Sequence, residues 1–188
     1  MIPYRMNPLG SGWPKEGSYG VFLTSSGTAV SSAIVMSGAI VSGPNHVQNV
    51  YSHGTARETV VSGGNMYVFA GGTANSITVN SGNIAVSKGG FVSKATLYNG
   101  AAIYMYNGAS AREIVFSGGS ASVAGNTVIS IATIAAGRIR VYYGGLTSSV
   151  VVSSGATLIV SSGGTAYSVT SRTGAIVSSA AGAVITYA

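Results

Sequence analysis

The chain has 188 residues, of which 28 are glycine and only 6% are charged. An ordinary soluble domain carries ~25% charged residues, so the composition excludes an amphipathic helical protein, whose solvent-facing helix surfaces need charge. Serine, threonine, alanine, glycine and valine dominate, and these residues suit short β-strands joined by tight turns.

The charge balance is basic, with nine lysines and arginines against three acidic residues and a net charge of +6. This balance fits an anionic partner such as lipopolysaccharide, an acidic glycan or nucleic acid, or it reflects only that few charges exist and most are basic. The basic residues do not form one run, and we expect no nucleic acid partner. Cysteine is absent, which excludes disulfides and cysteine metal sites.

Residues 1–20 contain three of the four prolines and the only tryptophan. They carry no apolar segment of the signal-peptide type. No run of ~18 apolar residues occurs anywhere in the chain, so we expect no membrane-spanning segment.

Beyond this segment, a glycine recurs at intervals of 18 or 19 residues. A second column of turn residues follows each of these glycines, and Asn126 is its one replacement by a residue that also tolerates positive φ. Two turn columns in register indicate a stack of equivalent structural units. The first column comprises Gly64, Gly82, Gly100, Gly119, Gly137, Gly155 and Gly174, and the second Gly72, Gly90, Gly108, Asn126, Gly145, Gly164 and Gly182.

Apolar residues recur at every second position on both sides of the first glycine column, as Ile77 and Val79 before Gly82 and Ile84 and Val86 after it. This period of two marks the inward face of a strand. A third short strand is expected around Val92 and Val128. Strands this short are stable only when equivalent strands stack ~4.8 Å apart. The sequence therefore predicts an all-β fold, a parallel β-helix (β-solenoid) with rungs of 18–19 residues.

The domain organisation follows from the repeat. We assign residues 21–188 to the β-solenoid, with regular rungs over about 54–182. The end of a solenoid exposes apolar core and unpaired strand edges. We therefore predict that residues 1–20 form a non-repeat N-terminal cap or an attachment segment.

Three stretches carry a family resemblance: GTARETVVSGGNMYVFAGG (54–72), GGTANSITVNSGN (71–83) and SGGTAYSVTSRTGA (162–175). They resemble the AIDA-type repeat of passenger domains in bacterial autotransporter adhesins, over about residues 54–182. The resemblance implies a right-handed parallel β-helix at a bacterial cell surface, with roles in adhesion, autoaggregation or biofilm formation. It also implies O-glycosylation, by heptose, of outward serines and threonines such as Thr78, Ser87 and Ser122. This sequence departs from the family in showing neither an autotransporter signal peptide nor a translocator β-barrel. We also expect repeats of this type in phage tail proteins and in other surface polymers.

We expect no catalytic, cofactor-binding or metal site, and thus no enzyme. Glu58 and Glu113 lie three rungs apart, roughly 14 Å along the axis at the strand spacing, which exceeds the separation of the carboxylate pairs in glycosidases. Each follows an arginine, and we interpret both as solvated ion pairs. His46 and His53, in an irregular stretch, are interpreted as surface loop residues, because a histidine pair alone makes at most a weak metal site.

One candidate interaction surface emerges from the positions between the inward ones on the strand after the first turn. Stacked rungs would place them side by side as an apolar stripe rich in tyrosine, which marks either a self-association face or a carbohydrate-stacking face. The alternative is a register shifted by one residue in the rungs at 103 and 158, which would move the residues there into the core. The stripe comprises Tyr67, Phe69, Ile103, Met105, Arg140, Tyr142, Leu158 and Val160.

The sequence thus predicts a non-enzymatic surface β-solenoid that mediates adhesion, autoaggregation or self-association. Its expected partners are further copies of itself, as an oligomer or filament, or a cell-surface glycan or receptor. A structural subunit of a phage tail or of an extracellular filament is the alternative, and a glycan-binding or glycan-degrading β-helix protein is a weaker one. The expected location is extracellular or the bacterial cell surface, or a virion for the alternative.

Overall fold

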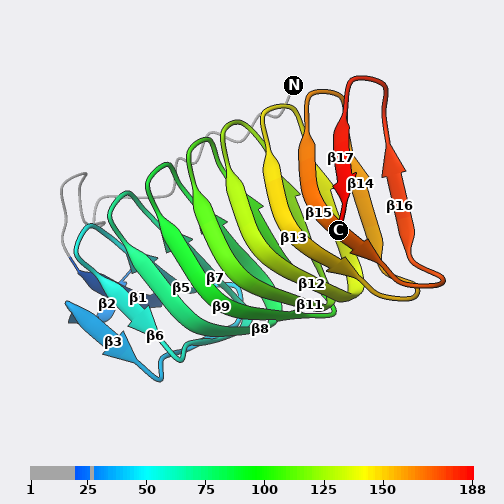
Figure 1. The fold of residues 1–188 in the computed structure, drawn as a ribbon. Helices are drawn as coiled ribbons and strands as arrows, with labels where there is room; N and C mark the ends of the chain where they lie inside the picture. Colours follow the sequence, from blue (N-terminus) through cyan, green and yellow to red (C-terminus); the bar gives the residue numbers. More distant parts are fainter. Residues whose placement is uncertain (1–19, 26–27) are drawn as a thin grey trace.

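A computed structural model describes residues 20–25 and 28–188, and every described element is a β-strand. Figure 1 shows the strands stacked along one axis, from the blue N-terminal strands at one end to β16 and β17 at the other. The strands are β1 (Val21–Ser25), β2 (Thr28–Ala33), β3 (Val35–Ser37), β4 (Ile40–Ser42), β5 (His46–Val50), β6 (Thr55–Arg57), β7 (Val60–Val68), β8 (Thr73–Val86), β9 (Phe91–Tyr98), β10 (Ala101–Met105), β11 (Ser110–Val123), β12 (Val128–Val141), β13 (Leu146–Val152), β14 (Thr157–Val160), β15 (Thr165–Ser171), β16 (Ile176–Ser179) and β17 (Val184–Tyr187).

Each rung has three sides separated by three corners. In the rung that begins at Thr73, residues 73–75 form the first side, 77–81 the second and 83–87 the third. The corners are Ser76, Gly82 and Gly89, and each has a positive φ, of 57°, 91° and 75° respectively. A left-handed residue turns the chain sharply, so three such residues per rung return it to its starting side.

Equivalent sides of successive rungs pair in parallel. The first residue of each rung is the partner of the first residue of the next one, and the shifts are those of the glycine repeat. The prediction of a parallel β-solenoid with 18- to 19-residue rungs is confirmed. The partners run Thr55, Thr73, Phe91, Ser110, Val128, Leu146, Thr165 and Val184.

The core fills the interior of the stack, and its residues come from the predicted inward positions. Val61, Val79, Leu97, Phe116 and Ile134 lie directly above one another on the second side, and all are fully buried. The third-side inward pairs from Met66 and Val68 to Ile139 and Val141 are buried as well. The third short strand expected from the sequence is the first side of the rung, where Val92 and Ile129 point inward.

The predicted glycine columns lie at two of the corners. Where two glycines adjoin, as Gly63–Gly64 and Gly118–Gly119, the first of them takes the positive φ. Asn126 also has a positive φ, of 52°. The third corner was not predicted, because residues other than glycine occupy it. Its left-handed residues are Glu58, Ser76, Lys94, Glu113, Ile131, Ser149 and Ser168.

An antiparallel pair of strands covers the third side of the stack at its N-terminal end. β1 pairs antiparallel with β2 on one edge and with β5, the third side of the first rung, on the other. Antiparallel addition ends the parallel ladder and covers its open edge. We expected residue 21 to begin the solenoid, whereas parallel pairing between rungs starts at Val35. The predicted cap, residues 1–20, lies outside the described residues except for Gly20.

Candidate ligand-binding groove

The third side of the solenoid carries the candidate site on its outer surface. Because side chains alternate across a strand, this side presents three outward columns that run along the axis, and two of them carry the candidate site. The first outward column is Tyr67, Ala85, Tyr104, Ser122 and Arg140. The second outward column, directly after the end of each strand, is Phe69, Ser87, Tyr106, Ala124 and Tyr142. The remaining column, Asn65, Asn83, Ala102, Ser120 and Arg138, lies at the edge next to the second corner.

Half of the predicted stripe lies on this surface. Tyr67, Phe69, Arg140 and Tyr142 are outward and partly exposed, as predicted. For the other four residues the alternative register is confirmed and the outward placement is wrong: Ile103, Met105, Leu158 and Val160 are buried in the core, with 0–3% of their surface exposed.

The difference comes from the length of the corner between the second and third sides. Six positions separate the inward Leu97 from Ile103 and the inward Val152 from Leu158, whereas five separate Ile134 from Ile139. In the rungs at 103 and 158 the same offset from the glycine therefore lands one position earlier on the strand. A shift of one residue exchanges the two faces, and Ile103 therefore pairs with the inward Ile84.

The sequence prediction missed the two residues that are central to the surface, Tyr104 and Tyr106. They alternate with Ile103 and Met105, which are buried, and Tyr104 is 41% exposed. The alternation of aliphatic and tyrosine residues over 103–106 was the signal that could have identified them.

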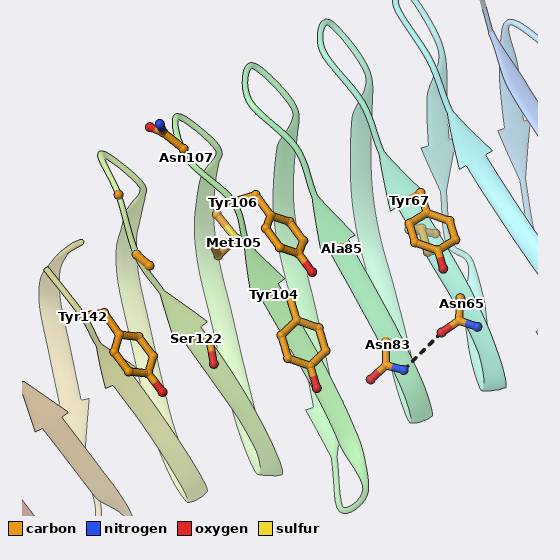
Figure 2. A pocket seen from close by; sticks show the side chains of 13 residues that line it. Asn65, Tyr67, Asn83, Ala85, Tyr104, Met105, Tyr106, Asn107, Ser122 and Tyr142 are labelled. Atoms are coloured by element: carbon orange, nitrogen blue, oxygen red, sulfur yellow. Dashed lines mark hydrogen bonds between the residues drawn. The ribbon is translucent and has the colours of Figure 1, made fainter. Parts of the chain in front are cut away.

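Large and small side chains alternate from rung to rung along both outward columns. Tyrosine or phenylalanine occupies the rungs of Tyr67, Tyr104 and Tyr142, and alanine or serine occupies the rungs between them, at Ala85 and Ser122. Neighbouring rungs lie ~4.8 Å apart, so the aromatic rungs repeat about every 10 Å. Figure 2 shows the rings standing out from the strands on either side of the smaller residues.

This alternation creates a groove of about 630 Å³ along the axis. Tyr67, Tyr104, Tyr106 and Tyr142 form its walls, and Ala85, Ser122 and Ala124 form its floor. The groove is open to solvent and continuous over the rungs of β7, β8, β10, β11 and β12. Its shape suits an elongated ligand that lies along the axis rather than a compact one.

Polar groups lie along the edge of the groove. Asn83 donates a hydrogen bond from Nδ2 to Oδ1 of Asn65, the equivalent residue in the preceding rung, at 3.1 Å. At the other end, the Arg140 guanidinium lies 5.9 Å from the centre of the Tyr142 ring and donates to its hydroxyl oxygen at 3.4 Å. Arg138 lines an adjoining hollow of about 470 Å³ on the same side. The groove is therefore lined by aromatic faces and amide groups, and two guanidinium groups lie beside it.

An aromatic cluster supports the N-terminal end of the groove. The rings of Tyr51 and Phe69 stack 4.7 Å apart and nearly parallel, and Phe22 contacts Tyr51 edge-on at 5.8 Å. Burial raises the pKa of the Tyr51 hydroxyl above its ordinary value of 10.0. Phe69 in turn lies 6.3 Å from the ring of Tyr67. This packing holds the first wall of the groove in place.

The described carboxylates lie away from the groove. Glu58 and Glu113 both occupy the corner between the first and second sides. Glu113 forms an ion pair with Arg112 at 3.2 Å, which confirms that prediction, whereas Glu58 accepts a hydrogen bond from the Ser37 hydroxyl at 2.9 Å. Glu16 lies outside the described residues.

The two histidines each contact a serine hydroxyl. The Nδ1 atom of His46 lies 3.4 Å from Oγ of Ser42, and that of His53 lies 3.0 Å from Oγ of Ser52. Within residues 20–25 and 28–188, no group of three or more histidine and acidic side chains is placed to hold a metal ion. In the same part of the chain, no helix is long and apolar enough to cross a membrane.

A solved structure is similar to this chain over most of its length. No protein-family model and no curated protein matches the chain. The chain is similar to a crystal structure of a TibA fragment described as hyper-glycosylated by TibC, with 22% sequence identity and a TM-score of 0.40, over 81% of this chain and 84% of that one. The assignment of the β-solenoid fold rests on the parallel pairing of the rungs themselves.

Proposed function

We propose that this protein is a non-enzymatic surface β-solenoid that mediates adhesion through the groove on its third side. The observation that carries the proposal is the row of solvent-accessible tyrosines along a groove of about 630 Å³. An exposed apolar surface of this kind costs free energy in water unless a partner covers it, and it therefore marks an interaction site. Tyrosine suits such a site because its ring offers apolar contact and its hydroxyl a hydrogen bond.

The rigidity of the scaffold also supports a binding role. Tyr67, Ala85, Tyr104 and Ser122 project from strands that pair with a neighbour on both sides, and the remaining wall and floor residues directly follow such strands. Side chains on such strands are already ordered before a ligand arrives, so binding costs little further conformational entropy. The proposed location is extracellular or at a bacterial cell surface, with a virion as the alternative.

The chemistry of the described surface supports a role without catalysis. Hydrolysis or elimination on a glycan requires carboxylates or an equivalent acid–base pair close to the bound chain. Glu58 and Glu113 lie at the corner opposite the side that carries the groove, three rungs apart along the axis. The prediction is that replacing both by glutamine leaves adhesion unchanged and that no glycan incubated with the protein is shortened.

A bead assay tests the proposed function. Beads coated with the protein are counted on monolayers of epithelial and bacterial cells, and clumping of the beads is measured in the same wells. We expect attachment or clumping above that of albumin-coated beads, and its loss when Tyr67 and Tyr104 are both replaced by serine. The matched control replaces Tyr98 and Tyr167, which are 44% and 45% exposed outside the groove. Equal attachment by both double variants, or none by the unmodified protein, would contradict the proposal.

A further inference from the structure

We infer that the groove binds a linear, negatively charged polysaccharide whose chain lies along the solenoid axis. The inference rests on the proposed adhesive function and names the class of ligand that the same groove takes. Three observations carry it: the repeat distance of the aromatic rungs, the chemistry of the groove wall, and the distribution of charge around it.

The repeat distance fits an extended sugar polymer. Aromatic residues come from every second rung, Tyr67 and Tyr104 in the first outward column and Phe69, Tyr106 and Tyr142 in the second, so successive walls lie about 10 Å apart. A pyranose unit in an extended chain advances the chain by about as much as the ~4.8 Å between neighbouring rungs. A polymer along the axis therefore places equivalent sugars, two units apart, beside successive tyrosines, and the register is kept over the whole groove.

The small side chains on the groove floor leave the space that such a polymer needs between the aromatic walls. Ala85 and Ser122 lie one rung beyond Tyr67 and Tyr104, in the same column. Their small side chains leave room for the sugars between the stacked ones. A ligand with a different repeat distance would clash with a tyrosine ring at some positions and lack a stacking contact at others.

The walls offer the interactions that sugars use. The C–H groups on one face of a pyranose carry partial positive charge and pack against the negative face of an aromatic ring. The hydroxyls around the sugar rim need donors and acceptors in the same plane. The amides of Asn65 and Asn83, the hydroxyl of Ser122 and those of the tyrosines lie along the groove for this purpose.

The charge around the groove selects an acidic polymer. Arg140 and Arg138 lie on the third side, whereas the described carboxylates, Glu58 and Glu113, lie at the opposite corner of their rungs. A guanidinium pairs with a carboxylate or sulfate through two parallel hydrogen bonds. The chain as a whole carries a charge of +6, which favours approach of a polyanion.

A second copy of the chain fits the same surface less well. It would bring another Arg138 and Arg140 and no described carboxylate from its own third side, so the two faces would repel. A second copy of the chain is thus the competing occupant of the groove, and self-association in solution would reveal it.

The experiment is a calorimetric titration of the full chain with hyaluronan oligosaccharides of two, four and six sugars, in which N-acetylglucosamine alternates with glucuronate. Cello-oligosaccharides of the same lengths serve as neutral probes. We expect the affinity for the acidic series to rise about tenfold or more from two to six sugars, as a second and a third tyrosine are engaged. Binding of the two series with equal affinity would overturn the assignment of an acidic ligand.

Variants at the groove locate the site. Tyr104→Ala is expected to weaken binding of the six-sugar ligand about tenfold, and Tyr98→Ala, on the second side, to leave it unchanged. Arg140→Gln is expected to weaken the acidic ligand and to reduce the salt dependence of its binding, and Arg172→Gln, at an exposed position on another side, to do neither. Equal effects of each groove variant and its control would overturn the inference. Circular dichroism confirms that each variant is folded.

The outcomes separate this inference from the proposed function. Groove-dependent bead attachment without binding of any oligosaccharide would overturn the inference and leave adhesion standing. Absence of both would overturn both. Light scattering that shows an oligomer abolished by Tyr104→Ala would identify a second copy as the occupant and overturn the inference.

Discussion

Replacing Gly137 by alanine should separate two adjacent rungs of the solenoid. Gly137 has a φ of 91°, a conformation that costs an alanine about 1–2 kcal/mol. A Cβ atom there would also overlap the carbonyl oxygen of Gly119 and lie 2.8 Å from the carbonyl carbon of Gly118. Both atoms belong to the backbone of the preceding rung, so neither can rotate away.

Relief of this overlap requires the two rungs to move apart next to the corner. The nearest parallel pairs are Ser117 with Ala136 and Ser120 with Arg138. Loss of two backbone hydrogen bonds costs about 2 kcal/mol, since each contributes ~1 kcal/mol net. Together with the backbone strain, we expect Gly137→Ala to lower the free energy of unfolding by about 3–4 kcal/mol.

Gly155 is the matched control, because it occupies the same corner one rung later. Its φ is 74°, and a Cβ atom there would meet nothing within 4 Å. Gly155→Ala therefore carries only the backbone strain, partly offset by the reduced entropy of the unfolded chain, and should cost about 1 kcal/mol or less.

Urea unfolding followed by circular dichroism measures both variants, with the unfolding slope checked for equality. Equal losses of stability in the two variants would refute the argument that contact between rungs, rather than the backbone conformation alone, makes glycine necessary at residue 137.

Three further predictions concern the core and the surface. Phe116→Ala, at the largest fully buried side chain, should lower the free energy of unfolding by about 3–5 kcal/mol in the same urea assay. Thr59→Val removes the hydroxyl that donates to Oε1 of Gln48 at 3.1 Å and should cost about 1–3 kcal/mol. Adding Gln48→Met should recover part of that loss, and a double-mutant cycle with no coupling would contradict the pairing. If outward serines and threonines are glycosylated, the intact mass of the protein from its native host should exceed the polypeptide mass by multiples of a sugar unit; equality of the two masses would exclude the modification.

The period of the repeat was readable from the sequence because it is a local property of the chain. Glycines of the repeat, such as Gly82 and Gly137, mark corners. Alternation of apolar and polar residues, as in Ile77-Thr78-Val79, marks a strand with one inward face. Each of these signals depends on a few neighbouring residues and repeats in every rung. The parallel stack, the core columns and two of the three corners therefore follow from the sequence.

The third corner was not readable, because its conformation is imposed by the rest of the rung. Ile131 has a φ of 59°, which a β-branched residue rarely adopts, and it is 42% exposed. Nothing in its own identity favours a corner. The two flanking sides pair with the rungs above and below, and their hydrogen bonds fix the direction change that Ile131 must make.

The sequence by itself determined that this chain folds as a stack of 18- to 19-residue rungs with an apolar interior. Only the tertiary structure decided which residues meet on the outside. Tyr67 and Tyr104 lie far apart in the chain, and they share the first outward column only because equivalent sides stack in register. The sequence left two registers open in this rung, one residue apart, and the structure decides for the one that buries Ile103 and exposes Tyr104. The register that prevents this error is set by the pairing of whole rungs, because side chains alternate faces at every residue.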